Sequence, residues 1–388
     1  MTDVHQLPTF GRHLCRIDDF VAIIEQPTPT PEFASRLEQR VPVFEASHLR
    51  DVITDAASQR AVRDVLAEVL DRGAGIFVIA GAFDHAVVDR ATSAFEAMIE
   101  QQHREGRAVG DHYAKPGAND RVWNAIEKLA VEAPDVFVDY YANDMAALGA
   151  LAWLGPNYQI SSQVNVVNPG GQAQQPHRDY HLGFMTDDQA ESYPAHTHRL
   201  SPMLTLQGAV AHCDMPVETG PTMYLPFSQQ YELGYLAWRN PDFIAYFDEH
   251  HTQLPLAKGD IVFFNPALFH AAGSNVTADV RRMANLLQIS SAMARAMETM
   301  DRIRMTNAVY PALLDRQAAG TDADALGNAL TAVADGYAFP TNLDNDPPLG
   351  GLTPPSHLDI LRDALTEGAS PEELAARLDA LAARRRSH

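Results

Sequence analysis

The sequence predicts a mainly β core, an antiparallel barrel or jelly roll, with helices before and after it in the chain. The middle of the chain holds several short β-rich runs separated by Gly, Pro and Asn turns. These runs do not alternate with helices as the strands of a doubly wound parallel sheet do. The expected strands are 160–167, 203–212, 222–225, 261–264 and 281–291.

Residues 1–72 are expected to form an N-terminal arm and a helix that packs on the core. Irregular, proline-containing sequence is followed, from about residue 50, by apolar residues at helical spacing. Gly73 and Gly75 end this helix, and a short buried strand follows at 75–79. Further helices are expected before the main strands, over about 83–102, from about 119, and over about 144–154.

The core domain is expected over residues 73–291, with an aromatic-rich helical insertion at about 228–248. Residues 292–388 are expected to form a helical extension. Its last helix opens with Ser370-Pro371-Glu372-Glu373, where serine is the predicted N-cap and Glu373 its capping-box partner. This extension could cover the barrel mouth or form a homodimer, and the sequence does not decide between them.

The composition limits the kinds of partner. The 388 residues carry a formal net charge of −21, which disfavours binding to nucleic acid or to an anionic membrane surface. Only three residues are lysines and the rest of the basic set is arginine, so a carboxylate pocket is expected to use arginine. The two cysteines cannot make a disulfide framework, and neither a signal peptide nor a membrane-spanning run is visible. We therefore expect a soluble, cytoplasmic protein with a small-molecule partner.

The segment His177-Arg178-Asp179 carries the chemistry. It follows a predicted strand and a Gly-rich turn, and residues two apart on extended chain point to the same side. An imidazole and a carboxylate placed in this way, together with a distant histidine, make the facial triad that binds Fe(II) and leaves three positions open.

Three other segments also match the pattern of histidine, any residue, acid. Those that begin at His103 and His357 lie in helical contexts, where residues two apart diverge. His212-Cys213-Asp214 is the serious rival because it lies near a strand end, and we interpret it as a strand-end histidine followed by a turn aspartate.

A second segment supplies the distant histidine. Gly259-Asp260 forms a turn that launches a strand, a proline bend follows, and His270 comes just after it. Arg281, eleven residues after His270, opens a strand of period two, so either it or its neighbour must point inward. A buried, unpaired guanidinium is costly, and a dicarboxylate co-substrate held bidentately would remove that cost. The alternative is a rim arginine in an ordinary ion pair.

Taken together, these motifs resemble the phytanoyl-CoA dioxygenase family over roughly residues 73–290. The shared order is Pro-Gly before His-x-Asp, then Glu218-Thr219-Gly220-Pro221 with Leu225-Pro226-Phe227-Ser228, then Gly-Asp, the distant histidine and the arginine. The resemblance implies a double-stranded β-helix that binds Fe(II), 2-oxoglutarate and O2. It implies His177, Asp179 and His270 as iron ligands and Arg281 as the anchor of 2-oxoglutarate. It also implies hydroxylation or desaturation rather than halogenation, because related halogenases lack the carboxylate that Asp179 provides.

Two departures from the family pattern affect the site. The strand after Gly220-Pro221 ends Pro226-Phe227-Ser228-Gln229 where family members often have Pro-Gly-Ser-His. Ala272 stands where some members have a serine or threonine that helps to hold the co-substrate. A second contact to the far carboxylate must therefore come from elsewhere or be missing. Gln163 and Asn165, on one face of the preceding strand, are candidate donors to 2-oxoglutarate, although such pairs can also be structural.

The substrate is expected to be small, such as an amino acid or a natural-product intermediate, because the low lysine count disfavours a large anionic thioester. Polar and aromatic residues upstream of the barrel could line a lid, or could equally form a capped helix packed on the core. The candidate substrate-binding residues are His112, Tyr113, Arg121, Trp123, Tyr180 and His181.

Two non-catalytic functions remain as alternatives, a barrel that binds a structural metal and a sensor or scaffold that binds a small acid. An inward Arg281 argues against the first, because a structural metal needs no co-substrate anchor. A three-ligand site with open positions argues against the second, because a carboxylate binder needs no iron.

Overall fold

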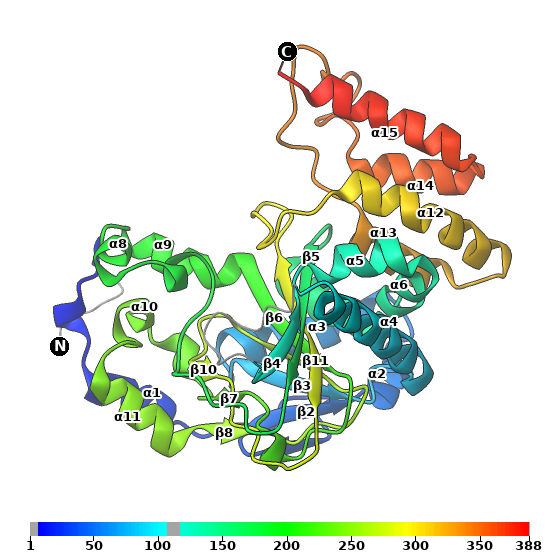
Figure 1. The fold of residues 1–388 in the computed structure, drawn as a ribbon. Helices are drawn as coiled ribbons and strands as arrows, with labels where there is room; N and C mark the ends of the chain where they lie inside the picture. The colour runs from blue at the N-terminus through cyan, green and yellow to red at the C-terminus, as the bar shows by residue number, and fades with distance from the viewer. Residues whose placement is uncertain (1–6, 107–116, 388) are drawn as a thin grey trace.

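The computed structural model describes residues 7–106 and 117–387, and it places two β-sheets at the centre of the chain (Figure 1). The larger has eight strands in the order β1-β2-β3-β9-β6-β11-β5-β4, and the smaller has the order β10-β7-β8. All pairs are antiparallel except β2 with β3. The strands are β1 (Arg36–Glu38), β2 (Val41–Glu45), β3 (Ile76–Ala80), β4 (Asn119–Val122), β5 (Gln159–Val167), β6 (Thr205–Ala211), β7 (Met223–Tyr224), β8 (Thr252–Gln253), β9 (Ile261–Phe264), β10 (His270–Ala271) and β11 (Arg282–Ser290).

Helices flank the sheets on both sides in the chain, which confirms the predicted jelly-roll core with helical surroundings. None of the described helices combines the length and the apolar character needed to cross a membrane. The helices are α1 (Ile17–Ile24), α2 (Ala46–Val52), α3 (Ala56–Asp71), α4 (His85–Arg104), α5 (Ala125–Glu132), α6 (Pro134–Tyr141), α7 (Asp144–Leu154), α8 (Asp187–Glu191), α9 (Ala195–Leu200), α10 (Gly234–Ala237), α11 (Pro241–His250), α12 (Arg302–Ala318), α13 (Ala323–Val333), α14 (His357–Glu367) and α15 (Pro371–Arg385).

The large sheet divides the molecule into two apolar clusters. On β11, Met283 and Leu287 pack into a cluster with helices such as α3 to α7, whereas Leu286 faces the opposite way. This alternation is that of a strand whose two faces are both covered. The second face meets the small sheet, α1, α10 and α11, and the predicted metal ligands lie on that side.

The structure corrects the expected helix from about residue 119. Asn119–Val122 is β4, which pairs with β5, and the helix begins only at Ala125, after Asn124 in the left-handed region. Val122 is buried in the strand, so its apolar character indicated burial and not helical periodicity.

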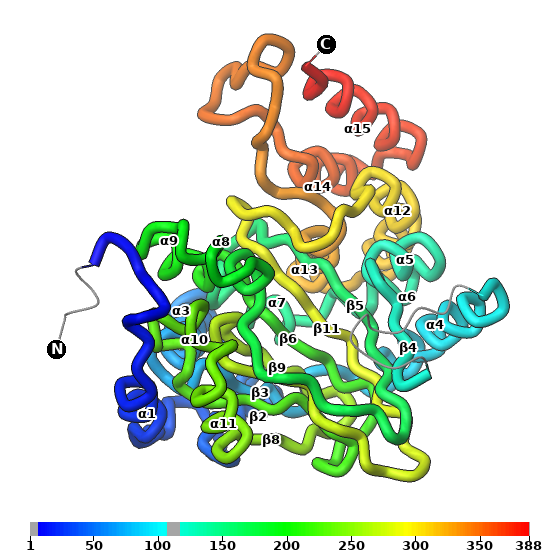
Figure 2. Tube along the Cα trace, turned by 60° about the vertical axis from the view of Figure 1, so that its left-hand side comes forward, coloured from blue at the N-terminus to red at the C-terminus, as the bar shows by residue number. Residues whose placement is uncertain are grey.

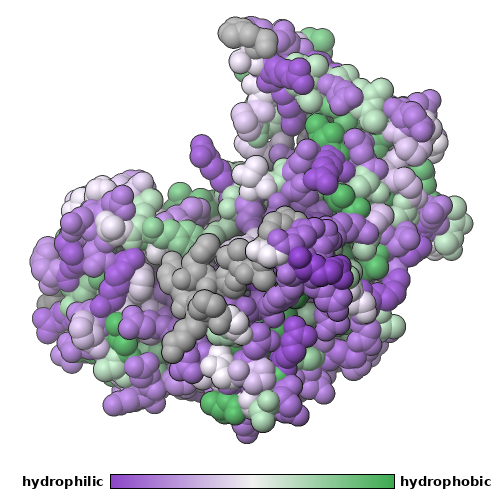
Figure 3. Space-filling model, viewed as in Figure 1, coloured by the Kyte–Doolittle hydropathy of each residue, from purple (hydrophilic) through white to green (hydrophobic). Residues whose placement is uncertain are grey.

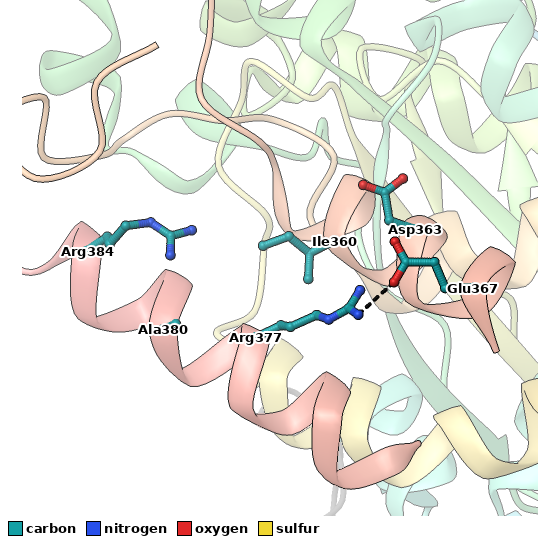
Figure 4. A pocket seen from close by; sticks show the side chains of 6 residues that line it. All are labelled: Ile360, Asp363, Glu367, Arg377, Ala380 and Arg384. Carbon is teal, nitrogen blue, oxygen red and sulfur yellow. Dashed lines mark hydrogen bonds and ion pairs between the residues drawn. The ribbon is translucent and has the colours of Figure 1, made fainter. Parts of the chain in front are cut away.

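The C-terminal helices pack on the helical layer. Helix α12 lies against α5 and α6, and α14 and α15 project from one end of the molecule (Figure 2). The predicted capping box at Ser370 is present. A shallow surface hollow lies between α14 and α15, where Arg377 forms an ion pair with Glu367 at 2.6 Å (Figure 4). Because that arginine is already paired, the hollow does not call for a charged ligand.

His212, the rival motif, lies on the helical side of the sheet, just after β6. Its Nδ1 is 2.8 Å from the Thr92 hydroxyl and its Nε2 is 2.9 Å from the Tyr140 hydroxyl. Burial lowers the pKa of His212 to about 3, so this imidazole is neutral in the folded protein. Both ring nitrogens are occupied, and the residue is a structural hydrogen-bonding group.

We expect His212 to make the fold sensitive to acid. Its pKa is lower in the folded chain than in the unfolded chain, so protons bind preferentially to the unfolded chain as the pH falls below about 6.5. Between pH 7 and pH 5 this residue should remove roughly 2 kcal/mol from the free energy of unfolding. His212→Gln should therefore show a smaller fall over that range in denaturant titrations, with His357 supplying part of what remains. Equal falls in both proteins would contradict this assignment.

Candidate metal and co-substrate site

The two predicted histidine ligands are held side by side by the main chain. His177 and His270 form an isolated antiparallel bridge in which each N–H donates to the other's carbonyl, at 3.0 and 3.2 Å. Their rings lie 4.5 Å apart between centroids. The Asp179 N–H donates to the Pro266 carbonyl at 3.2 Å, which holds Asp179 beside the segment between β9 and β10 that leads to His270.

In each imidazole the main chain fixes one nitrogen, and the other lies near Asp179. Nδ1 of His177 is 3.0 Å from the Gln175 carbonyl, and Nδ1 of His270 is 2.8 Å from the Leu268 carbonyl. Because a carbonyl only accepts, both Nδ1 atoms carry the hydrogen and both Nε2 atoms present a lone pair. This is the arrangement by which proteins orient histidine ligands.

The candidate ligand atoms converge. Nε2 of His177 lies 3.6 Å from Asp179 Oδ1, and Nε2 of His270 lies 3.3 Å from Asp179 Oδ2. One ligand atom from each of the three residues lies within 4.8 Å of the others. The Gln207 amide donates to Asp179 Oδ2 at 2.5 Å and so orients the carboxylate. Burial would raise the pKa of Asp179, but the two imidazoles and Gln207 hold it well below its usual range.

The inward arginine is Arg282, and the expectation that Arg281 points inward was wrong. Arg282 is 6% exposed, and burial lowers its pKa to about 10. Among the described residues its guanidinium has no hydrogen-bond or ion-pair partner. The Arg281 side chain is half exposed, with its Nη2 3.6 Å from Asp120 and its Nε donating to Asn168 at 3.3 Å.

Strand register explains the difference. β11 pairs with β5 from Arg282 opposite Val167, and with β6 so that Gln288 lies opposite Gln207. Since Gln207 reaches Asp179, the alternate residues of β11 from Gln288 back to Arg282 face the metal ligands. Arg281 precedes the strand and points to the opposite side, so the inward-pointing arginine is one residue later than the resemblance implied.

The sequence model of the phytanoyl-CoA dioxygenase (PhyH) family matches residues 72–283, more than half of the chain. The chain belongs to the phytanoyl-CoA dioxygenase family. It is accordingly an enzyme of the class that depends on iron and 2-oxoglutarate, and the converging ligands described above fit that requirement. No curated protein has a sequence that matches this one at a significant level.

Solved structures give further similarities. The epimerase SnoN from nogalamycin biosynthesis, described as non-heme and alpha-ketoglutarate dependent, is 19% identical, with 61% of this chain and 82% of that chain covered and a TM-score of 0.41. The carbocyclase SnoK of the same biosynthesis is 20% identical, with 62% and 85% covered and a TM-score of 0.42. AviO1 from Streptomyces viridochromogenes Tue57 is 17% identical, with 61% and 96% covered and a TM-score of 0.44.

The candidate co-substrate residues of this family member lie on the inward face of β5. Gln163 is already engaged, since it accepts from Arg121 at 3.1 Å and donates to Gln288 at 3.4 Å. Asn165 is buried, and its carbonyl oxygen has no partner among the described residues. It pairs with Ala284 of β11, so along the strand it lies between Arg282 and Gln288. Asn165 is therefore the better placed of the two to contact 2-oxoglutarate.

The candidate substrate residues fall into two groups. The Arg121 guanidinium lies over the Trp123 ring at 4.7 Å and beside Gln163, so both residues come close to the inward face of the sheet. Tyr180 and His181 follow the ligand Asp179 directly, and His181 Nδ1 is 2.9 Å from the Ser201 hydroxyl. His112 and Tyr113 lie outside the described residues, so their predicted role stays a prediction.

Several residues of the site were not identified from the sequence, and Arg282 and Gln207 are among them. Arg281 shares its face of the strand with Met283 and Leu287, which pack against helices. This pattern could have indicated that Arg282 points to the other face. Gln207 is a lone polar side chain within an otherwise apolar strand interior, which is a usable signal.

Arg178, between two metal ligands, anchors the ligand loop to the helical insertion. It is 2% exposed, and its guanidinium donates to the carbonyls of Ser228 and Tyr231 at 2.5 and 2.9 Å. It lies over the rings of Tyr235 and Phe269. Gly234 leaves the necessary room, because a Cβ there would overlap the guanidinium. We infer that Arg178 fixes the spacing between His177 and Asp179.

We expect Arg178→Met to weaken Fe(II) binding roughly tenfold or more, as loss of an orienting contact does in other metal sites. Arg302→Met is the matched control, since Arg302 also donates to two main-chain carbonyls but belongs to α12. Anaerobic metal titrations with parallel stability measurements would separate the two effects. Equal losses of iron affinity in both variants would show that Arg178 acts only through stability.

Proposed function

We propose that this enzyme is a 2-oxoglutarate-dependent hydroxylase that acts on an unactivated C–H bond of a small molecule, such as an amino acid or a natural-product intermediate. The observation that carries the proposal is the combination of a converging triad with the buried Arg282 guanidinium, which has no partner among the residues that the structure describes. A structural metal site would need the triad alone, and a simple acid-binding barrel would need only the arginine.

The residues present fit Fe(II). Nε2 of His177, Nε2 of His270 and the Asp179 carboxylate would hold it, and this donor set leaves positions for other ligands. Iron, together with 2-oxoglutarate and O2, supplies the oxidation of the substrate C–H bond while 2-oxoglutarate is converted to succinate and CO2. The chain orients these partners and shields them, and the Phe264 ring packed edge-on to His270 at 4.9 Å contributes to the shielding.

Arg282 would bind the far carboxylate of 2-oxoglutarate. An unpaired buried guanidinium is unfavourable, and a carboxylate bound bidentately offsets that cost. Tyr224 lies opposite His270 in the small sheet, and burial raises its pKa while the Thr222 hydroxyl and the Arg282 charge oppose the rise. Tyr224 is therefore close to Arg282, and we assign to its hydroxyl the second contact that Ala272 cannot make.

Asp179 supports hydroxylation rather than halogenation. Its carboxylate occupies the third protein position of the triad, which a halide would have to take, and Gln207 fixes it there. Formation of a chlorinated product by the wild-type enzyme in chloride would contradict this part of the proposal.

The adjacent arginines offer a matched test of the anchor. Anaerobic titration of 2-oxoglutarate into the Fe(II) protein should give the weak visible charge-transfer band of the chelate, and His177→Ala should abolish it. Arg282→Ala should weaken 2-oxoglutarate binding about tenfold or more, because a charge-assisted bond is worth about 1.5–3 kcal/mol.

The control is Arg281→Ala, which removes a half-exposed arginine one residue away and should leave the affinity within about twofold, as for an exposed ion pair. An equal or larger loss in Arg281→Ala would place the co-substrate elsewhere. Absence of the band in folded, metal-bound wild-type protein would overturn the proposed function.

A further inference from the structure

Two buried polar groups beside the metal ligands have no hydrogen-bond partner in the part of the chain that the structure describes. Tyr180 is 3% exposed, and its hydroxyl is unpaired. Oε2 of Glu298 is also buried and unpaired, although Oε1 accepts from the Asn124 N–H at 2.8 Å. A buried polar group without a partner costs about 1–3 kcal/mol. Two such groups in one place indicate a site that a ligand completes.

Tyr180 directly follows the candidate ligand Asp179, and Glu298 accepts from Asn124, just after β4, whose Arg121 reaches Gln163 on the inward face of β5. Burial raises the pKa of Tyr180, and the charges of Asp179 and Glu298 raise it further. Burial also raises the pKa of Glu298, and the Asn124 N–H, the charges of Lys128 and Arg121 and the Gln163 side chain oppose that rise. Tyr180 is therefore electrostatically coupled both to a metal ligand and to Glu298, although the two come from segments more than a hundred residues apart in the chain.

The backbone at Tyr180 is strained. Tyr180 has φ 62° and ψ 151°, and His181 has φ 40°, which are conformations that L residues with side chains rarely adopt. Each costs on the order of 1–3 kcal/mol and persists only where the surroundings impose it. The Gly183 N–H, which donates to the Tyr180 carbonyl at 2.8 Å, and the contact from His181 to Ser201 hold this turn. The fold thus maintains strain while leaving the hydroxyl unpaired.

Exposed apolar side chains lie in the same segments as these groups or in segments that contact them. Phe184 is 57% exposed, Met203 51% and Met293 74%, and Met297 is adjacent in sequence to Glu298. These residues lie in three segments, 180–184, 201–204 and 291–298, which contact one another. His181 contacts Ser201, and the Ser291 N–H donates to the Leu204 carbonyl at 2.9 Å. Figure 3 shows apolar side chains beside the α8–α9 segment on this face. Methionine side chains adapt to irregular apolar ligands.

We propose that Glu298 and Tyr180 bind a hydrogen-bond-donating group of the substrate, an ammonium or a hydroxyl, while the apolar body of the substrate lies against Phe184, Met293 and Met297. This inference rests on the proposed function and names the substrate class for the same site. A carboxylate oxygen accepts hydrogen bonds and attracts positive charge, so an ionised Glu298 disfavours an anionic group beside it. The strongly acidic chain favours the same choice.

The test uses three probes that share a phenyl ring and differ in the polar group: phenethylamine, phenethyl alcohol and phenylacetate. Each is titrated calorimetrically, without O2, into protein loaded with Fe(II) and 2-oxoglutarate, and the chelate band is recorded in the same samples. The band reports on the proposed function, and the order of affinities reports on this inference. Failure of the one is therefore distinguishable from failure of the other.

We expect the amine and the alcohol to bind at least tenfold more tightly than phenylacetate. Glu298→Gln should remove most of that preference, and Tyr180→Phe should weaken both favoured probes severalfold. Glu127→Gln is the matched control, because Glu127 is a nearby carboxylate already engaged by Asn124 and Arg304, and it should leave the order unchanged. A preference for the amine that depends on Glu298 identifies an ammonium substrate, and equal binding of amine and alcohol identifies a hydroxyl.

Three outcomes would overturn the inference. These are tightest binding of phenylacetate, no effect of Glu298→Gln on the order of affinities, and no binding of any probe to protein that shows the chelate band.

Discussion

The site depends on the main-chain bridge between His177 and His270. Two reciprocal hydrogen bonds hold strand ends that are distant in sequence in register, so the two imidazoles lie side by side before any metal binds. Each ring is then rotated into place by a carbonyl two residues upstream that accepts from Nδ1. The histidine geometry is therefore fixed by backbone groups, and such a site loses little conformational entropy when it takes up iron.

The other residues of the site are determined by which face of the large sheet each side chain points to. Because Gln207 reaches Asp179, the register of β6 with β11 determines which side chains face the candidate metal ligands. That register brings Arg282 inside and leaves Arg281 at the surface with Asp120. The opposite face packs against helices and supplies the larger apolar cluster. One face of the sheet thus packs against helices and stabilises the fold, and the other face carries the candidate ligands.

Much of this site could be predicted from the sequence because it is local. Residues two apart on extended chain must point the same way, which marks His177 with Asp179, and a turn–strand–bend segment marks His270. The choice between adjacent arginines could not be made in the same way, since it depends on pairing with strands far away in the chain. Asn119–Val122 was mistaken for helix because only pairing with β5 makes it a strand. Glu298 contacts Asn124, which is distant in sequence, only through the tertiary fold.

The central claim is that the triad binds the metal while Arg282 binds the far carboxylate of 2-oxoglutarate. A crystal structure of the protein with Mn(II) in place of Fe(II), soaked with 2-oxoglutarate, tests it most directly. The account predicts metal between the two Nε2 atoms and Asp179, with the co-substrate chelating it and its far carboxylate on the Arg282 guanidinium. Metal at other residues, or a far carboxylate bound by Arg281, would contradict the account.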